Sequence, residues 1–152
     1  MADANSCRQT LERYLKARIP IISVRTTERA RALELLRGII SNLNIPGFVH
    51  TLSQGMRDLV TNRSINEDRS VPGALDFASQ QISQRQNLTF VLTEVADIED
   101  DTPTARQFQD VVMLAAEKGG CLVIITSKPV WGQLQRLGMT ITLDLPTEDE
   151  ML

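Results

Sequence analysis

LTFVLTEVADIEDD, residues 88–101, is the stretch that decides the fold. It begins with an apolar run, Leu88 to Leu92, which ends abruptly at Thr93 and Glu94. A short apolar run bounded by polar residues is typical of a buried strand in a parallel sheet. Because open α/β sheets bind ligands at the carboxyl ends of such strands, this stretch also predicts where a site would lie. The acids that follow it are Asp97, Glu99, Asp100 and Asp101.

Apolar segments on both sides of this stretch predict four more strands. They cover residues 19–24, 48–52, 121–125 and 139–145. Segments with apolar residues at helical spacing predict helices at 10–17, 26–43, 72–86, 103–118 and within 128–137. Strands that alternate with helices form a parallel sheet, so we predict an α/β three-layer sandwich with a five-stranded, mainly parallel sheet.

Residues 53–71 fit this alternation least well. They are mostly polar, and only Met56, Leu59 and Val60 suggest a helical turn near the start. The part from Asn62 to Ser70 shows no periodicity, so it is predicted as a solvated loop. Connections of this length are usually functional or lack secondary structure of their own.

Capping residues predict where several helices begin and end. A threonine N-cap is expected at Thr26 or Thr27, and Thr104 with Gln107 has the spacing of a capping box. Gly119 is expected to end the fourth long helix. Another helix is expected to start near residue 147, which leads us to expect that the chain continues into a longer protein.

Composition narrows the classes of protein. The 152 residues suffice for one domain, 1–152, and the net charge of −3 argues against a dedicated nucleic-acid binder. No apolar run approaches the roughly 20 residues of a membrane span, and the N-terminus lacks the apolar core of a signal peptide. Cys121 is predicted to be buried and Cys7 to be at least half-exposed. Two unpaired cysteines favour a reducing compartment, either the cytoplasm or a plastid stroma.

A phosphate-binding loop is absent from the position where a nucleotide hydrolase needs it. That loop, GxxxxGK[ST], would lie between the first strand and the next helix. The junction here reads VRTTER, residues 24–29, with neither glycine nor lysine. The remaining candidates for holding an anion are Arg25, Thr26 and Thr27 at the start of the helix, although Glu28 would repel a phosphate. We therefore predict a sheet without a P-loop.

The acids after the central strand are also incomplete as a hydrolytic site. Glu94 lies where a catalytic glutamate would be, but Thr93 lies where an acid should hold magnesium, and a hydroxyl is a poor substitute for a carboxylate. We predict no metal site and no cofactor in this domain. Ser127, at the end of the fourth strand, could contact a γ-phosphate, but a strand-terminal turn with Lys128 and Pro129 is the preferred interpretation. His50, the only histidine, is predicted to lie at a sheet surface without a catalytic partner.

Four segments resemble a known family. The chain is similar to the N-terminal region of the AAA-type ATPases encoded as a conserved open reading frame in chloroplast and cyanobacterial genomes. The order and spacing of the segments carry the likeness. They are IPIISVRTTERARALELL at 19–36, FVLTEVADIEDD at 90–101, KGGCLVIITSKP at 118–129 and TITLDLPTEDE at 140–150.

The resemblance implies a degenerate ATPase core with a RecA/AAA-like sheet in the order 5-1-4-3-2. It matches Glu94 to the second acid of the Walker B pair and places Ser127 near the sensor position. Thr93 and the stretch 25–29 depart from the ATPase pattern, which puts hydrolysis by this domain in doubt. The resemblance also implies an active module after Leu152, and any ATP and Mg²⁺ would belong to that module.

Two functions from different classes follow, and a third is weaker. The first is a non-catalytic ATPase-like domain for assembly or for recognition of a protein partner or substrate, with self-association into a homo-oligomer left open. Its contact surfaces would be the loops 53–71 and 94–103, with Gly55, Met56, Asp97, Asp100 and Asp101 as candidates. The second is a weak nucleotide-binding or nucleotide-sensing domain that uses Glu94 and a non-standard phosphate site. The third is a free-standing, flavodoxin-like ligand-binding domain.

Overall fold

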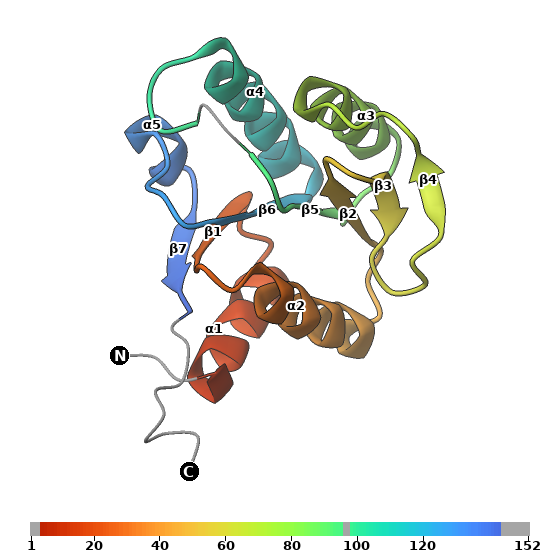
Figure 1. Ribbon diagram of the computed structural model, residues 1–152, viewed down its shortest axis with the longest axis vertical. Coiled ribbons are helices and arrows are strands. Elements are labelled where there is room, and N and C mark those ends of the chain that lie inside the picture. Colours follow the sequence, from red (N-terminus) through yellow and green to blue (C-terminus); the bar gives the residue numbers. More distant parts are fainter. Residues whose placement is uncertain (1–3, 96–97, 144–152) are drawn as a thin grey trace.

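The computed structural model describes residues 4–95 and 98–143 and shows an α/β sandwich of three layers (Figure 1). The expected helix at residue 147 and the candidate Asp97 lie outside the described residues. The helices are α1 (Ala4–Lys16), α2 (Arg29–Leu43), α3 (Val71–Gln84), α4 (Pro103–Lys118) and α5 (Gly132–Gln135). The strands are β1 (Ile21–Arg25), β2 (Gly47–Thr51), β3 (Gly55–Asp58), β4 (Ser64–Asn66), β5 (Thr89–Leu92), β6 (Cys121–Thr126) and β7 (Met139–Thr142).

The sheet has seven strands in the order β4-β3-β2-β5-β6-β1-β7, so the prediction of five strands was wrong. The five predicted strands are β1, β2, β5, β6 and β7. They pair in parallel with one another, and their order is the one that the resemblance implied. The additional β3 and β4 extend the sheet beyond β2 as antiparallel strands.

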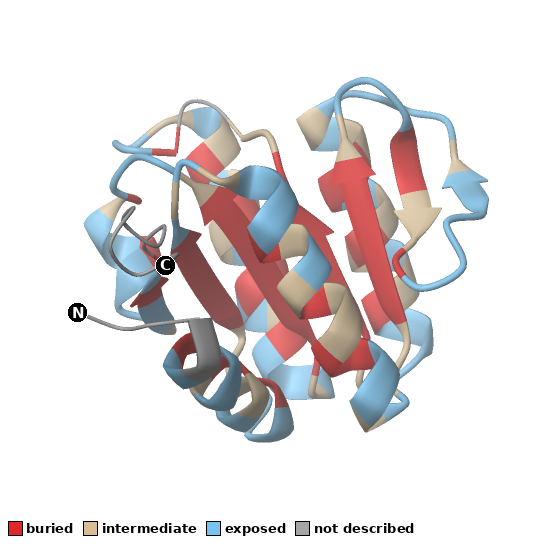
Figure 2. Ribbon diagram, turned by 60° about the horizontal axis from the view of Figure 1, so that its bottom comes forward, coloured by how far each residue is buried: buried red, intermediate tan, exposed pale blue. Residues whose placement is uncertain are grey.

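The central strands β1, β2, β5 and β6 send alternate side chains to two separate cores. On β6, Leu122 and Ile124 join the core under α3, α4 and α5, whereas Val123 and Ile125 join the core under α1 and α2. This alternation follows from the two-residue period of a strand. Figure 1 shows α3 and α4 on one face of the sheet and α1 and α2 on the other. In Figure 2 the central strands are buried between helices that are exposed on their outer sides.

Three aromatic side chains pack together in the first core. Phe90, on β5, stacks on Phe48 of the adjacent β2 with ring centroids 5.0 Å apart. Phe77, on α3, meets both rings edge-on, at 6.4 Å from Phe48 and 6.3 Å from Phe90. Offset-stacked and edge-to-face pairs are the favoured arrangements of aromatic rings. This cluster fixes α3 over the β2–β5 pair.

A β-hairpin replaces the predicted helical turn and loop at residues 53–71. Met56 and Leu59 are fully buried, but they reach the core from β3 and from the residue after it. The Asp58 carboxylate accepts hydrogen bonds from the backbone N–H groups of Val60 and Thr61, which closes the turn into β4. Gly55 has φ +75°, and a Cβ there would lie 2.5 Å from the Asn66 carbonyl oxygen. Only glycine allows the two strands to approach so closely.

The helix ends differ from the predictions at two of the three positions for which a capping residue was predicted, and Ser70 is an N-cap that was not predicted. Helix α2 has Glu28 as its N-cap residue, without a side-chain hydrogen bond to the helix. Ser70 caps α3 by accepting from the Gly73 N–H at 3.0 Å, and Thr102, not Thr104, caps α4 by accepting from the Ala105 N–H at 3.1 Å. Gly119 ends α4 in the left-handed conformation, as predicted.

Two predictions about burial were wrong. Cys7 is buried between α1 and β7, where its thiol donates to the Thr142 carbonyl oxygen at 3.4 Å. His50 is buried in β2 and does not lie at the sheet surface. Cys121 is buried as predicted, and this burial raises the pKa of its thiol to about 12. Within the described residues, no helix combines the length and the apolar character needed to cross a membrane.

Candidate functional site

A cleft of about 510 Å³ opens at the carboxyl ends of the parallel strands. Three connections line it: the turn from β1 to α2, the segment from β5 to α4, and the segment after β6. This is the edge at which open α/β sheets hold their ligands. The cleft is therefore the first place to test the chemistry that the sequence suggested.

The cleft brings together five of the residues predicted from the sequence. These are Thr26, Thr27, Glu94, Asp100 and Ser127. The other candidates are elsewhere: Arg25 and Asp101 do not line the cleft, and Gly55 and Met56 are buried in β3. Because Met56 is fully buried, these last two residues offer no surface that a substrate could touch in this structure.

The turn between β1 and α2 is held by its own hydrogen bonds. The Thr26 N–H donates to the Thr126 carbonyl oxygen of β6 at 2.9 Å. Its hydroxyl accepts from the Glu28 N–H at 3.0 Å, so a donor at the start of α2 is already satisfied. A P-loop works in the opposite way, because it leaves several backbone N–H groups pointing at the phosphates. This turn is built as a short structural connection.

Glu94 is engaged by an ion pair with Arg29. The Arg29 Nη1 and Glu94 Oε1 atoms lie 3.2 Å apart, and the Glu94 side chain is only 29% exposed. Arg29 is the first residue of α2, so the pair joins the start of that helix to the end of β5. A glutamate that orients an attacking water needs its carboxylate available in the cleft. Here Glu94 lines the cleft, but its Oε1 atom is paired with Arg29, which links the start of α2 to the segment after β5.

Thr93, like Glu94, already has a bonding partner, which is the backbone of the neighbouring strand β2. Its hydroxyl donates to the His50 carbonyl oxygen at 3.0 Å, and its N–H donates to the same oxygen at 3.2 Å. The side chain is 2% exposed. Both donors extend the pairing of β5 with β2 by one residue. The Thr93 hydroxyl is therefore a structural group that joins β5 to β2.

Replacing Thr93 by valine should lower the free energy of unfolding by about 1–2 kcal/mol. Valine has nearly the same shape but no hydroxyl, so the His50 carbonyl oxygen would lose a buried donor. Urea unfolding followed by circular dichroism would measure the change. Thr140→Val, at an exposed position of β7, is the matched control and should shift stability by less than about 0.5 kcal/mol. An equal effect of both changes would contradict this structural role for Thr93.

The segment after β6 carries Ser127 and Lys128. The Thr126 hydroxyl accepts from the Lys128 N–H at 3.1 Å and closes a turn that leaves Ser127 exposed. This geometry agrees with the simpler interpretation of Ser127 as a turn residue. Lys128 Nζ lies 3.6 Å from Glu99 Oε1 across the cleft. Sequence reasoning missed Arg29 and Lys128 as cleft cations. The available signal was their position in the connections that follow β1 and β6, since Lys128 lies two residues after β6 and Arg29 is the first residue of α2.

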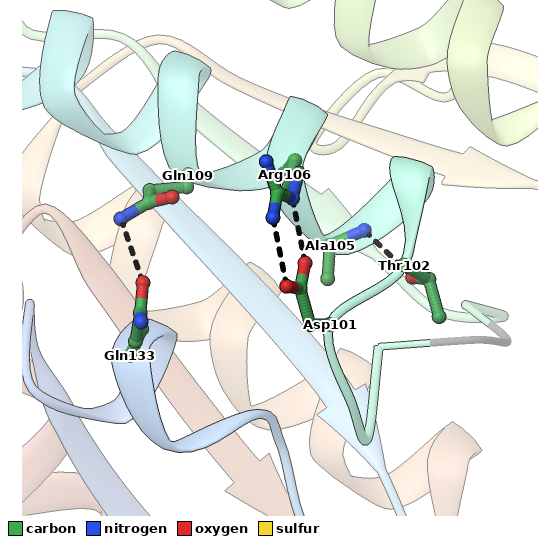
Figure 3. A network of polar contacts seen from close by, with 6 residues as sticks. All are labelled: Asp101, Thr102, Ala105, Arg106, Gln109 and Gln133. Carbon is green, nitrogen blue, oxygen red and sulfur yellow. Dashed lines mark hydrogen bonds and ion pairs between the residues drawn. The ribbon is translucent and has the colours of Figure 1, made fainter.

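Asp101 faces α4 and not the cleft. Figure 3 shows its two carboxylate oxygens accepting from the Arg106 guanidinium, at 2.6 Å and 2.8 Å. These bonds lower the pKa of Asp101 below its usual value. The adjacent Thr102 caps the same helix, so residues 101–102 together fix the start of α4. Further along α4, Gln109 donates to Gln133 of α5 at 3.5 Å (Figure 3).

His50 has a structural role and no catalytic partner among the described residues. Its Nε2 donates to the Asp68 carbonyl oxygen at 3.2 Å and thereby holds the segment before α3 against β2. Burial lowers its pKa, so the ring is neutral at physiological pH. Within residues 4–95 and 98–143, no three histidine, cysteine, aspartate or glutamate side chains lie close enough together to hold a metal ion.

A second, more apolar hollow of about 440 Å³ adjoins the cleft. Its walls come from the residue after β2, the start of α3, the segment between β5 and α4, and the start of α4. They are Leu52, Val71, Pro72, Val95 and Thr104. The hollow also shares Arg29, Glu94 and Val95 with the larger cleft, so the two depressions meet at the Arg29–Glu94 ion pair.

Comparison with known families gives a match over nearly the whole chain. A family model described as "SpoVK-like AAA ATPase, N-terminal domain" matches residues 7–143. The match covers all seven strands and both cores. The search of curated proteins found no match.

Proposed function

The chain belongs to the family of N-terminal domains of SpoVK-like AAA ATPases, and we propose that it is a non-catalytic accessory domain for assembly or for recognition of a protein partner. One observation carries the proposal. The two residues at the hydrolytic positions, Thr93 and Glu94, are both used to hold the fold together, by the His50 carbonyl oxygen and by Arg29. The Thr93 hydroxyl is thus used by the backbone of β2, and one carboxylate oxygen of Glu94 is used by an ion pair, which supports a role other than hydrolysis.

The electrostatics of the cleft support the same proposal. A triphosphate needs unpaired cations and backbone donors. In the described part of the cleft both cations, Arg29 and Lys128, are within ion-pair distance of glutamates, and the β1–α2 turn contains no glycine. The largely exposed rim at residues 99–103 is then available for contact with a protein.

Further features of the proposal rest on the sequence resemblance. We propose that the domain acts beside an active ATPase module of the same protein, which would supply the ATP and Mg²⁺ chemistry. We also propose, from the same resemblance, that the relatives of this chain occur in chloroplasts and cyanobacteria. We propose further that the domain is located in the cytoplasm or plastid stroma and that it self-associates into a homo-oligomer. Nucleic acid and membrane partners are not part of the proposal, since the net charge is −3 and the chain has no long apolar run.

Titration of the chain with ATP and Mg²⁺ in a calorimeter tests the proposal. We expect no saturable heat, which corresponds to a dissociation constant weaker than about 1 mM. The physical reason is that phosphates would have to displace Glu94 from Arg29 and would face the Glu99 and Asp100 carboxylates. The same samples should show no phosphate release above buffer.

One outcome would establish the nucleotide-sensing alternative instead. It is micromolar binding of Mg²⁺–ATP that is lost in Glu94→Gln and in Arg29→Ala, both changes inside the cleft. Arg25→Ala is the matched control, since Arg25 is an exposed arginine at the end of β1 that does not line the cleft. Binding that survives in this control but not in the cleft variants would assign the nucleotide to the cleft.

A further inference from the structure

We propose that the two adjoining depressions form one groove that binds a segment of a protein partner carrying a lysine or arginine close to an apolar side chain. The inference rests on the proposed function, because a nucleotide in the cleft would compete for the same surface. It goes further by stating the chemistry of the partner. The argument uses the shape, the apolar wall and the charges of the groove.

The groove is continuous because its two parts share residues. Arg29, Glu94 and Val95 line both the polar cleft and the apolar hollow. The two volumes, about 510 Å³ and 440 Å³, are each in the range of a small-ligand pocket. A ligand that fills both parts must therefore place a polar group in the cleft, on one side of the ion pair, and an apolar group in the hollow, on the other side.

The apolar hollow groups several partly exposed apolar side chains. Leu52 is 45% exposed, and beside it lie the half-buried Val71 and Val95 and the exposed Pro72. Leu52 follows β2, Val95 lies in the segment after β5, and Val71 and Pro72 begin α3, so three parts of the chain converge to form the hollow. An exposed apolar patch with a polar border is typical of a protein-binding surface. A leucine, isoleucine, methionine or phenylalanine side chain would bury this wall.

The polar cleft is complementary to a cation. Its two basic side chains are paired, Arg29 with Glu94 and Lys128 with Glu99. Asp100 lines the cleft and forms no ion pair among the described residues. The cleft therefore presents one net negative charge. A lysine or arginine of the partner would complete the charge pairing, whereas a phosphate or an acidic segment would be repelled.

Selection of a random 12-residue peptide library on the immobilised chain tests the proposal. We expect the selected peptides to share a lysine or arginine within about four residues of a large apolar residue. One of them, synthesised with a fluorescein label, then serves as the probe in an anisotropy titration. We expect its dissociation constant to rise severalfold between 0.05 M and 0.5 M NaCl, because salt screens a surface ion pair.

Two pairs of variants test whether the peptide binds in the groove, each pair comparing a groove residue with a control residue outside it. Asp100→Lys should weaken binding at least fivefold, whereas Asp110→Lys, which reverses an exposed acid on α4 outside the groove, should change it less than twofold. Leu52→Ser should also weaken binding about fivefold. Its control, Val60→Ser, removes a side chain that is likewise 45% exposed but lies beside the β3–β4 turn. Circular dichroism melting curves confirm that all four variants fold.

Each contrary result has a definite meaning. If the library gives no shared pattern, or if each variant binds like its control, the groove proposal is overturned while the accessory-domain proposal stands. If Mg²⁺–ATP displaces the probe, the cleft is a nucleotide site and both proposals fail. If the chain self-associates in sedimentation equilibrium and Asp100→Lys abolishes this association, the occupant is a second copy of the chain, and the proposal of a separate partner is overturned.

Discussion

Phe90→Ala is expected to lower the free energy of unfolding by about 4 kcal/mol, enough to leave a domain of this size barely folded. Phe90 is fully buried on β5, near the middle of the sheet. Its removal would leave a cavity between Phe48 and Phe77, because both rings pack against it. Urea unfolding followed by circular dichroism would measure the loss, and the unfolding midpoint should fall sharply.

Two controls separate the aromatic contacts from simple loss of volume. Phe90→Leu keeps most of the apolar volume and should cost about 1–1.5 kcal/mol. Met113→Ala removes an exposed side chain of α4 and should change stability by less than about 0.5 kcal/mol. A loss below about 1.5 kcal/mol for Phe90→Ala would contradict the prediction, since it would mean that Phe48 and Phe77 close the cavity.

Gly138→Ala is expected to lower the free energy of unfolding by about 3 kcal/mol through overpacking. A Cβ at Gly138 would overlap the Ile21 carbonyl oxygen and would lie 2.6 Å from the Ile21 Cγ2 atom. Because the obstacle is the backbone at the start of β1, no side-chain rotation can relieve it. The chain would have to move at residue 138, where β7 begins its pairing with β1.

The expected signature is local as well as global. Hydrogen exchange should become faster at the amides of β7, since the pairing of Met139 with Ile22 would be disturbed first. Gly132→Ala is the matched control because a Cβ there meets nothing within 4 Å, and it should leave the unfolding midpoint nearly unchanged. If both variants unfold at the wild-type midpoint, the close approach of residue 138 to β1 does not hold in solution.

The parallel part of the fold was predictable because its signals are local. The β5 run LTFVL and the β6 run CLVII are short, apolar and bounded by polar residues, and Gly119 has the chemistry of a helix end. The hairpin was not predictable in the same way. The β4 sequence SIN has no apolar alternation, and the turn depends on the Asp58 carboxylate reaching two backbone N–H groups. Turn chemistry of this kind leaves little trace in hydrophobic patterning.

The position of the candidate site was predictable from the sequence, but the hydrogen bonds and ion pairs of its side chains were not. Sequence reasoning placed Thr26, Glu94, Asp100 and Ser127 at one edge of the sheet, and the structure brings them into one cleft. It could not show that the Thr93 hydroxyl is bonded to His50, because the two residues are 43 positions apart in the chain. The Arg29–Glu94 ion pair is equally non-local. Only the folded structure shows which polar groups already have a hydrogen-bond or ion-pair partner.

The β3–β4 hairpin also determines which strand forms this edge of the sheet. A sheet that stopped at β2 would present a regular strand of five residues, with a row of unpaired backbone groups that another chain could join. The hairpin covers that row and replaces it with β4, which has only three residues and a register irregularity at Met56 and Arg57. Short, irregular outer strands are poor templates for intermolecular pairing. The segment that resembled a simple loop in the sequence thus protects the domain from aggregation.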